Sequence, residues 1–136
     1  NTEYVQKAAN PAFLHRSVAA VTDRIVHDIF SPPVASRIYA YSSIAAFEAL
    51  VPSDSTLVSL AGQLNGLSPG PKPEVGKTYC FPLASVKALL KVGRALIFSE
   101  SELDVYHDQI MTEFRATGIP DDVFDRSVAF GESVAD

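Results

Sequence analysis

The sequence is poor in the residues that mark several large classes of protein. It contains one cysteine among 136 residues, Cys80, and a single cysteine cannot form an internal disulfide or a cysteine-based metal site. Its 11 lysine and arginine residues face 16 aspartate and glutamate residues, which gives a net charge of −5 without any basic run. Because nucleic-acid binding requires a positively charged surface, this composition argues against a nucleic-acid partner.

The start of the chain also lacks an apolar run. NTEYVQKAAN does not resemble a signal peptide, although a mature chain would look the same after removal of its signal. Hydrophobic residues nevertheless make up 47% of the chain and charged residues 20%, which argues against disorder and allows a substantial core. The period-two alternation of half-buried strands is absent, so the sequence predicts an all-α helical bundle over residues 1–136.

A catalytic constellation is absent from the sequence as well. It shows no zinc-ligand spacing, nucleophile elbow or redox pair of cysteines. His27 follows Asp23 by four residues on a predicted helix and could act as an oriented acid–base group, but the same spacing is typical of a surface ion pair. His107 has no second ligand at metal-site spacing. We therefore predict no catalytic, cofactor-binding or metal-binding residue in this chain.

The segment from Ser31 to Pro52 is the most apolar part of the sequence. Ser31 can cap a helix, Pro32 and Pro33 fit its first turn, and Pro52 ends it. Because surface helices are apolar on one face only, this segment predicts a central helix that is the most buried element of the fold. A membrane span is disfavoured by its two charges and by the prolines at both ends. The residues expected to be nearly inaccessible are Ile38, Ala45 and Ala49.

Three polar or aromatic residues of this helix, Arg37, Tyr41 and Glu48, share one stripe. Arg37 and Tyr41 are four residues apart, and Tyr41 and Glu48 are seven apart. Both intervals are close to whole helical turns, so the three side chains lie on one face of the helix. Arg37 and Glu48 lie about 16 Å apart along the axis at 1.5 Å per residue, so they cannot pair with each other. A buried charge would need a partner from another element, whereas both charges could also contact solvent at the helix ends, which we favour. We assign all three residues structural roles.

Four further amphipathic helices are predicted. The first begins at Asn10-Pro11, where asparagine can cap the helix and proline fits its first position, and it continues to residue 30. The others cover residues 82–98, 99–118 and 121–136, each with apolar residues at helical spacing. Gly93 lies inside one of them and indicates close approach of another helix, since glycine costs about 1 kcal/mol there relative to alanine.

The helix ends in the second half of the chain carry further signals. Ser99 and Glu102 have the spacing of a capping box, and Gly118 fits a left-handed helix stop. Acidic residues from Asp121 onward suit the positive end of the last helix. The apolar pattern of that helix is still running at Asp136, without a capping residue. We therefore expect residues 1–136 to be an incomplete domain that lacks its C-terminal half.

Residues 52–82 change in character. Asp54 or Ser55 can cap a short helix that ends at Asn65-Gly66, and a long proline-rich loop follows. Within this loop GPKPEVGKT, residues 70–78, resembles a phosphate-binding loop. Five residues separate its first glycine from the Gly-Lys-Thr where that motif has four, and two of the five are prolines without an N–H group. We therefore expect no nucleotide binding.

The order of these segments resembles a known family. SPPVASRIYAYSSIAAFEAL resembles the helix near the start of bacterial vanadium-dependent haloperoxidases, which belong to the type 2 phosphatidic acid phosphatase superfamily. YHDQIMTEFRATGIPDDVFDRSVAFGESVAD resembles a later helix pair of that family, and the segment between them resembles Bacteroidetes lipoproteins of the family. The resemblance covers nearly the whole chain and consists of helix-packing patterns. It implies the N-terminal portion of a vanadium haloperoxidase/acid phosphatase-like fold.

The resemblance also implies a chemistry that this chain does not carry. The haloperoxidases hold vanadate with a histidine and with lysine, arginine, serine and glycine donors, and the related phosphatases hold phosphate in the same cage. The three motifs that supply these donors are absent here, so vanadate or phosphate is expected in the missing half. Arg37 matches a family position and keeps its structural assignment. The location implied by the resemblance is a periplasmic or cell-envelope lipoprotein whose signal has been removed.

Two classes of function remain open. In the first, the chain is the N-terminal scaffold of an oxyanion-binding enzyme that performs peroxide-dependent halide oxidation or phosphate-ester hydrolysis, and the chain alone is not an enzyme. In the second, it is a stand-alone helical binding or scaffold module without catalysis. The expected partner is the C-terminal half of the same precursor or a second copy of the chain. The sequence does not select the substrate or the oligomeric state.

Overall fold

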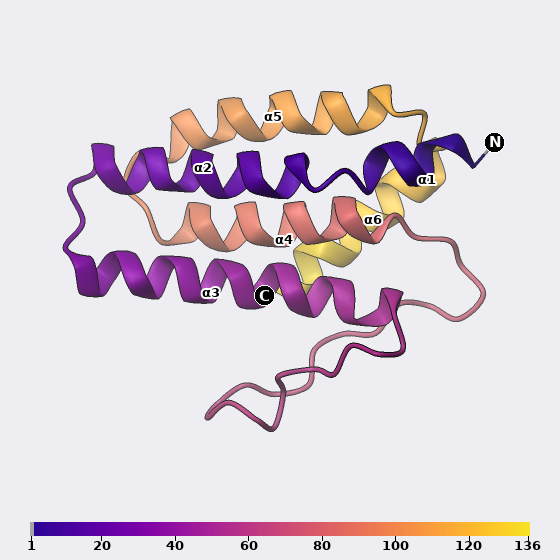
Figure 1. The fold of residues 1–136 in the computed structure, drawn as a ribbon, viewed down its shortest axis with the longest axis horizontal. Helices are drawn as coiled ribbons and strands as arrows, with labels where there is room; N and C mark the ends of the chain where they lie inside the picture. Colours follow the sequence, from indigo (N-terminus) through magenta and orange to yellow (C-terminus); the bar gives the residue numbers. More distant parts are fainter. Residues whose placement is uncertain (1) are drawn as a thin grey trace.

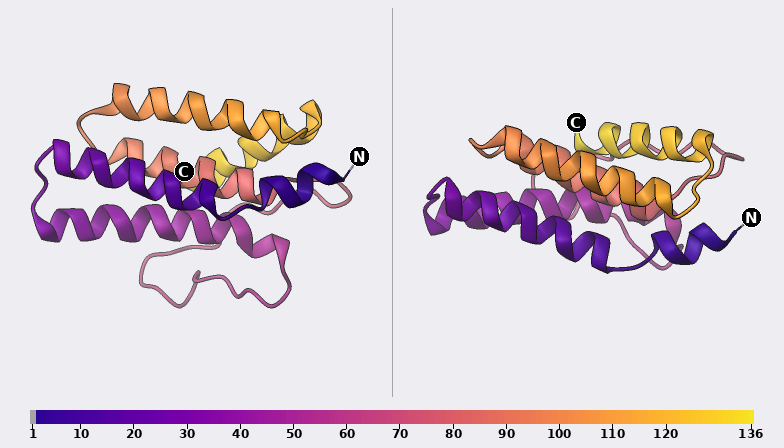
Figure 2. Two further views of the ribbon diagram at one scale, coloured as in Figure 1. Left: turned by 45° about the horizontal axis from the view of Figure 1, so that its top comes forward. Right: turned by 90° about the horizontal axis from the view of Figure 1, so that it is seen from above.

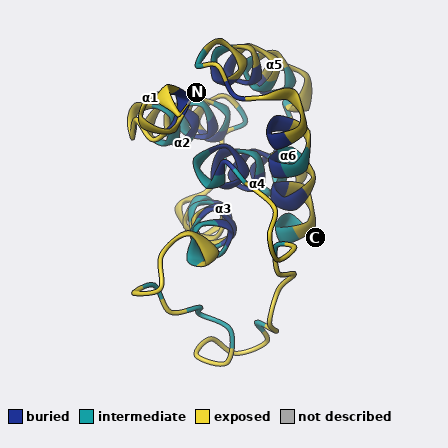
Figure 3. Ribbon diagram, turned by 90° about the vertical axis from the view of Figure 1, so that its right-hand side faces the viewer, coloured by how far each residue is buried: buried dark blue, intermediate teal, exposed yellow. Residues whose placement is uncertain are grey.

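Helix α4 (Phe81–Ala95) lies at the centre of the fold, and the other long helices surround it (Figures 1 and 3). The computed structural model describes residues 2–136, and apart from one isolated β-bridge their regular structure is entirely helical, as the sequence predicted. α4 packs against each of the helices α2, α3, α5 and α6. In chain order the other elements are α1 (Glu3–Ala8), α2 (Ala12–His27), α3 (Pro32–Leu50), the 3₁₀ turn η1 (Val51–Ser53), α5 (Glu100–Ala116) and α6 (Asp121–Ala135).

The most buried element is α4 and not α3, so the prediction for the Ser31–Pro52 helix is wrong on this point. Eight of the fifteen residues of α4 are buried, against five of nineteen in α3. Ile38, Ala45 and Ala49 are nearly inaccessible, as predicted, with exposed fractions of 2%, 6% and 0%. The opposite face of α3 is open, however, since Tyr41 remains 49% exposed. α3 has helical neighbours on one side only (Figure 3).

The cationic residues of α4 explain why its sequence looks like that of a surface helix. Lys87 has a side chain only 14% exposed, and its Nζ atom lies 2.7 Å from Nε2 of His107 and 3.4 Å from a carboxylate oxygen of Glu132. Long aliphatic stems allow such side chains to cover apolar surface while their charged ends reach polar partners. α4 can therefore be central although one of its faces carries charges.

Two glycines allow neighbouring helices to approach α4 closely. A Cβ atom at Gly93 would lie 3.1 Å from Cγ2 of Val21 in α2, which confirms the predicted close approach. A Cβ atom at Gly131 of α6 would lie 2.5 Å from the backbone oxygen of Ala84 in α4. The second contact is with backbone, so the packing of α6 on α4 requires glycine at this position.

Residues 54–80 form an irregular loop that extends away from the helices (Figures 1 and 2). The short helix predicted after Asp54 or Ser55 does not form. The Oδ1 atom of Asp54 accepts hydrogen bonds from the backbone N–H of Thr56 at 2.8 Å and from its hydroxyl at 2.7 Å. This local turn competes with a helix for the same backbone groups. Gly66 adopts a positive φ of 81° in a turn and does not end a helix.

Some of the predicted helix ends are correct and others are not. Asn10 accepts a hydrogen bond from the N–H of Ala12 at 3.0 Å, and Gly118 has a φ of 97°, as expected of a cap and a left-handed stop. The capping box at Ser99 does not form, because the Ser99 hydroxyl donates to Asp28 at the end of α2. The short helix α1, with Tyr4 and Ala8 buried, was not predicted.

The helices formed by residues 2–136 are all too short or too polar to cross a membrane. This agrees with the prediction made from the two charges and the flanking prolines of the α3 segment.

Candidate functional site: a groove along α3

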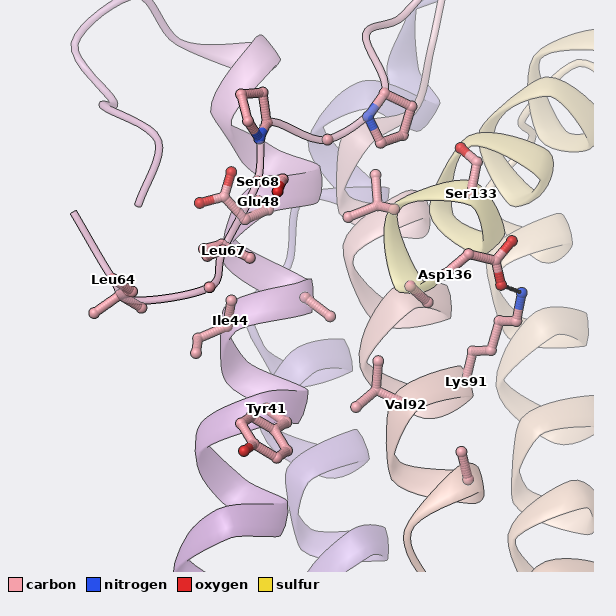
Figure 4. A pocket seen from close by; sticks show the side chains of 18 of the residues that line it. Tyr41, Ile44, Glu48, Leu64, Leu67, Ser68, Lys91, Val92, Ser133 and Asp136 are labelled. Atoms are coloured by element: carbon pink, nitrogen blue, oxygen red, sulfur yellow. Dashed lines mark hydrogen bonds and ion pairs between the residues drawn. The ribbon is translucent and has the colours of Figure 1, made fainter. Parts of the chain in front are cut away.

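A groove of about 950 Å³ lies along α3, between this helix and the C-terminal end of α6 (Figure 4). α4 lines it as well, and residues 64–71 of the long loop cross it at one end. Most of the lining side chains are apolar, with a few polar groups at the margin. The lining residues are Tyr41, Ile44, Ala45 and Glu48 from α3, Lys91, Val92 and Ala95 from α4 with Leu96 directly after it, and residues 133–136, where α6 and the chain end.

The stripe predicted on α3 follows this groove. Tyr41 and Glu48 line it, together with Ile44 between them. Arg37 lies one turn before Tyr41 and just beyond the lining residues. Its side chain is exposed and forms no hydrogen bond or ion pair with any of residues 2–136. The structure therefore brings two of the three selected residues to one site and leaves the third as a free cation beside it.

Glu48 has a defined partner, in contrast to Arg37. It is half-buried, and its carboxylate accepts hydrogen bonds from the backbone N–H of Leu60 and from the hydroxyl of Ser59, both at 2.7 Å. Bonds of this kind to a carboxylate are among the stronger hydrogen bonds in proteins. They hold the beginning of the long loop against α3. Arg37 is exposed, as we favoured. Glu48 lies in the last turn of α3, as we also favoured, but it is half-buried and has partners in the loop.

The cations of α4 are each engaged by carboxylates of this chain. Lys91, on the margin of the groove, pairs with Asp136 (Figure 4). Nε of Arg94 lies 2.7 Å from Asp104, and a second guanidinium nitrogen lies 3.2 Å from Glu100. The hydrogen bond from Arg94 holds the pKa of Asp104 below its ordinary value, and the same bond raises the pKa of Arg94. These ion pairs connect α4 with its neighbours.

The groove does not have the donors that a bound oxyanion needs. A vanadate or phosphate cage requires several cationic groups that converge on one point, whereas Lys91 is the one cation of the lining and already pairs with Asp136. Among residues 2–136 there is also no group of three or more histidine, cysteine, aspartate or glutamate side chains placed to hold a metal ion. The chemistry of the lining fits an apolar occupant instead.

The histidines singled out in the sequence lie outside the groove. Nδ1 of His27 is 3.0 Å from Asp28, so the predicted surface pair with Asp23 is wrong. Asp28 is fixed beside His27 because its carboxylate also accepts the backbone N–H groups of Phe98 and Ser99 at the start of α5. His107 lies between Lys87 and Asp108 in a contact of α4 with α5, which suits a structural role.

Ile44, Val92 and Leu96 of the groove were missed because apolar spacing does not distinguish a core face from an open face. A usable signal lies in the prolines at 69, 71 and 73. They restrict φ along this part of the loop, and a long ordered loop of this kind is often functional, as at the groove, where Pro69 and Pro71 belong to the lining.

Comparison with known proteins supports the resemblance found in the sequence. No protein-family model matches the chain, and no curated protein matches it. A solved structure described as the first bacterial vanadium-dependent iodoperoxidase matches with a TM-score of 0.84 and 40% sequence identity. The match covers 92% of this chain and 30% of the iodoperoxidase chain, so this chain spans less than a third of that protein. The predicted all-helical haloperoxidase fold is confirmed. In sequence and in fold, the chain is similar to a helical part of the bacterial vanadium-dependent haloperoxidases.

Proposed function

We propose that residues 1–136 are the helical scaffold of an oxyanion-binding enzyme related to the vanadium-dependent haloperoxidases, and that the catalytic residues lie on polypeptide outside this chain. The observation that carries this proposal is the 40% identity to the bacterial iodoperoxidase over 92% of the chain. The activity we assign to the complete enzyme is peroxide-dependent halide oxidation with vanadate as the bound oxyanion. Phosphate-ester hydrolysis is the alternative, because related phosphatases use the same type of cage.

The interactions within the chain support a scaffold role. The cations of α4 that could bind an anion, Lys87, Lys91 and Arg94, are paired with carboxylates of α5 and α6 and with Asp136. They hold helices together and are not available for a ligand. The apolar core around Leu83, Leu89 and Phe114 is continuous, with exposed fractions of 0%, 2% and 0%. A rigid helical support of this kind is what a site on a second polypeptide segment would need.

The same core is compatible with the second candidate, a stand-alone binding module, because it is built from residues of this chain. The two candidates differ in whether the chain can support the catalytic part of a haloperoxidase. A scaffold of the haloperoxidase type should replace the matching part of the iodoperoxidase, whereas an unrelated module should not.

The test is a chimeric enzyme in which residues 1–136 replace the matched segment of the bacterial iodoperoxidase. We expect the chimera to unfold in one cooperative transition, to bind vanadate in calorimetry and to oxidise iodide with peroxide, with the intact iodoperoxidase as reference. Residues 1–136 alone should bind vanadate no better than millimolar, as expected of surface ion pairs. A folded chimera without vanadate binding, or micromolar binding by residues 1–136 alone, would overturn the proposal. A chimera that hydrolyses p-nitrophenyl phosphate and does not oxidise iodide would select the phosphatase alternative.

A further inference from the structure

We propose that the α3 groove is the docking site for an amphipathic helix of the polypeptide outside this chain, and that this helix carries an acidic residue opposite Arg37. This inference rests on the proposed function and adds to it the surface and the chemistry of the contact.

The shape and the lining of the groove favour a helix as its occupant. Tyr41 and Ile44 form one wall, and Val92 of α4 faces them across the groove (Figure 4). Ala45 also lines the groove but is only 6% exposed, so Tyr41 and Ile44 provide most of the surface that α3 offers to an occupant. A helix places apolar residues at intervals of three and four along one face, and an elongated apolar groove between helices is the surface that receives them.

Charge defines one end of the groove. Arg37 extends the line of Tyr41 and Ile44 by one turn and has no partner among residues 2–136. At the other end Glu48 is already bound to Ser59 and Leu60, and Lys91 is paired with Asp136. Arg37 is therefore the charge of this stripe that has neither a hydrogen-bond nor an ion-pair partner among residues 2–136. A helix that fills the groove would complement it with a carboxylate at the Arg37 end.

The similar iodoperoxidase indicates where this helix comes from. The chain matches 30% of that protein, so 70% of its length lies outside the matched part. A surface of this kind is a better candidate for an internal contact than for a second copy, because the proposed function already requires the remaining polypeptide to meet this scaffold.

A second apolar surface provides a competing location. It consists of Val26, Ile29, Phe30 and Phe98 where the α2–α3 and α4–α5 connections meet at one end of the molecule, and we call it the end patch (Figure 1). Ile29 is 88% exposed and Phe98 is 79% exposed. The rings of Phe30 and Phe98 already pack on each other at 5.0 Å between centroids. This contact within the chain already covers part of the end patch, so the patch suits a helix less well.

Thiol labelling in the chimera separates these possibilities. Tyr41→Cys places a thiol in the groove, Val26→Cys places one in the end patch, and Val75→Cys places one in the fully exposed loop. The natural Cys80 is 4% exposed, and burial raises the pKa of its thiol, so it provides a low background. Each variant is labelled with a maleimide, both as residues 1–136 alone and within the chimera.

We expect the thiol at position 41 to react at least about tenfold more slowly in the chimera than in residues 1–136 alone, because docking excludes the reagent. The thiols at positions 26 and 75 should react at the same rate in both. If position 41 stays reactive in a chimera that binds vanadate, the docking site is wrong while the proposed function stands. Protection at position 26 in place of position 41 would move the contact to the end patch. Protection at position 41 in residues 1–136 alone that grows with protein concentration would identify a second copy as the occupant. Each of these three results overturns the inference.

Discussion

Helices α3 and α4 lie side by side, and the more apolar of the two in composition is the less buried. α3 consists largely of alanine, serine and aliphatic residues, while α4 carries Lys87, Lys91 and Arg94. Yet α4 is enclosed by four helices, and α3 leaves one face open along the groove. The difference teaches that apolar composition measures how much surface a helix can bury. The number of neighbours that the fold supplies decides how much of that surface is buried.

The largest effect that distinguishes the two helices should come from truncating a side chain in each. Leu89→Ala in α4 removes a side chain with 2% exposure, and we expect a loss of about 2–5 kcal/mol in the free energy of unfolding. Ile44→Ala in α3 removes a half-exposed side chain and should cost about 1 kcal/mol. Urea denaturation of residues 1–136 provides the measurement. Equal losses would mean that α3 is as central as its composition suggests.

The second effect concerns the glycines that bring helices close to α4. Gly131→Ala places a Cβ atom against the backbone oxygen of Ala84, so α4 and α6 must separate, at a cost of about 1–3 kcal/mol. The matched control is Gly93→Ala, whose Cβ atom meets the side chain of Val21. Here the strain is partly offset by the better helix propensity of alanine, about 1 kcal/mol. The midpoint of thermal unfolding should fall much more for Gly131→Ala, and the reverse order would contradict the close packing of α6 on α4.

A third effect concerns the contact between the end of α2 and the start of α5. Burial of the Asp28 carboxyl raises its pKa, but hydrogen bonds from His27, from the backbone of Ser99 and Phe98 and from the Ser99 hydroxyl outweigh burial and hold the pKa well below its ordinary value. Stability from this group is therefore present above the pKa of unfolded aspartate, about 3.9, and is lost as pH falls toward the lower folded value.

Asp28→Asn should consequently be less stable than the natural chain at pH 7, and its stability should fall less steeply below pH 4. Urea midpoints at pH 7, 5 and 3.5 provide the comparison. Asp23→Asn is the control, because Asp23 is an exposed residue of the same helix. If Asp28→Asn and Asp23→Asn show the same pH profile, the connection between α2 and α5 contributes nothing to stability.

The smallest effect in the isolated chain is expected at Arg37. Arg37→Glu should change the stability of residues 1–136 by less than about 0.5 kcal/mol, because the side chain is exposed and pairs with none of residues 2–136. In the iodoperoxidase chimera the same substitution should cost about 1–3 kcal/mol, since it places two carboxylates together. Lys72→Glu in the exposed loop is the matched control and should be neutral in both. If Arg37→Glu leaves the stability of the chimera unchanged, the proposed helix does not carry an acidic residue opposite Arg37.

Much of this fold could be predicted from the sequence, because its local signals agree with its packing. Prolines and asparagine mark the starts of α2, α3 and α4, Gly118 ends the region of α5, and Gly93 marks a close helix contact. The resemblance to vanadium-dependent haloperoxidases was also recognisable, since the quoted segments keep the helix-packing pattern of that family.

The remainder depended on contacts between distant residues. The centrality of α4 could not be read from its lysines, because their pairing with His107, Glu132 and Asp136 is set by the arrangement of α5 and α6. The predicted capping box at Ser99 does not form for the same reason, since the Ser99 hydroxyl donates its hydrogen bond to Asp28, about seventy residues earlier in the chain. The groove could not be predicted because it is formed by three helices and a loop.

Amide hydrogen exchange of α3 and α4 tests the central difference most directly. In residues 1–136 alone, the amides of Leu83–Leu90 in α4 should exchange most slowly, and those of Arg37–Glu48 in α3 should exchange faster. In the iodoperoxidase chimera, exchange in α3 should slow to the level of α4, while α4 changes little, because a docked helix supplies the neighbour that α3 lacks. An α3 segment whose exchange is the same in the chimera as in the isolated chain would contradict the account.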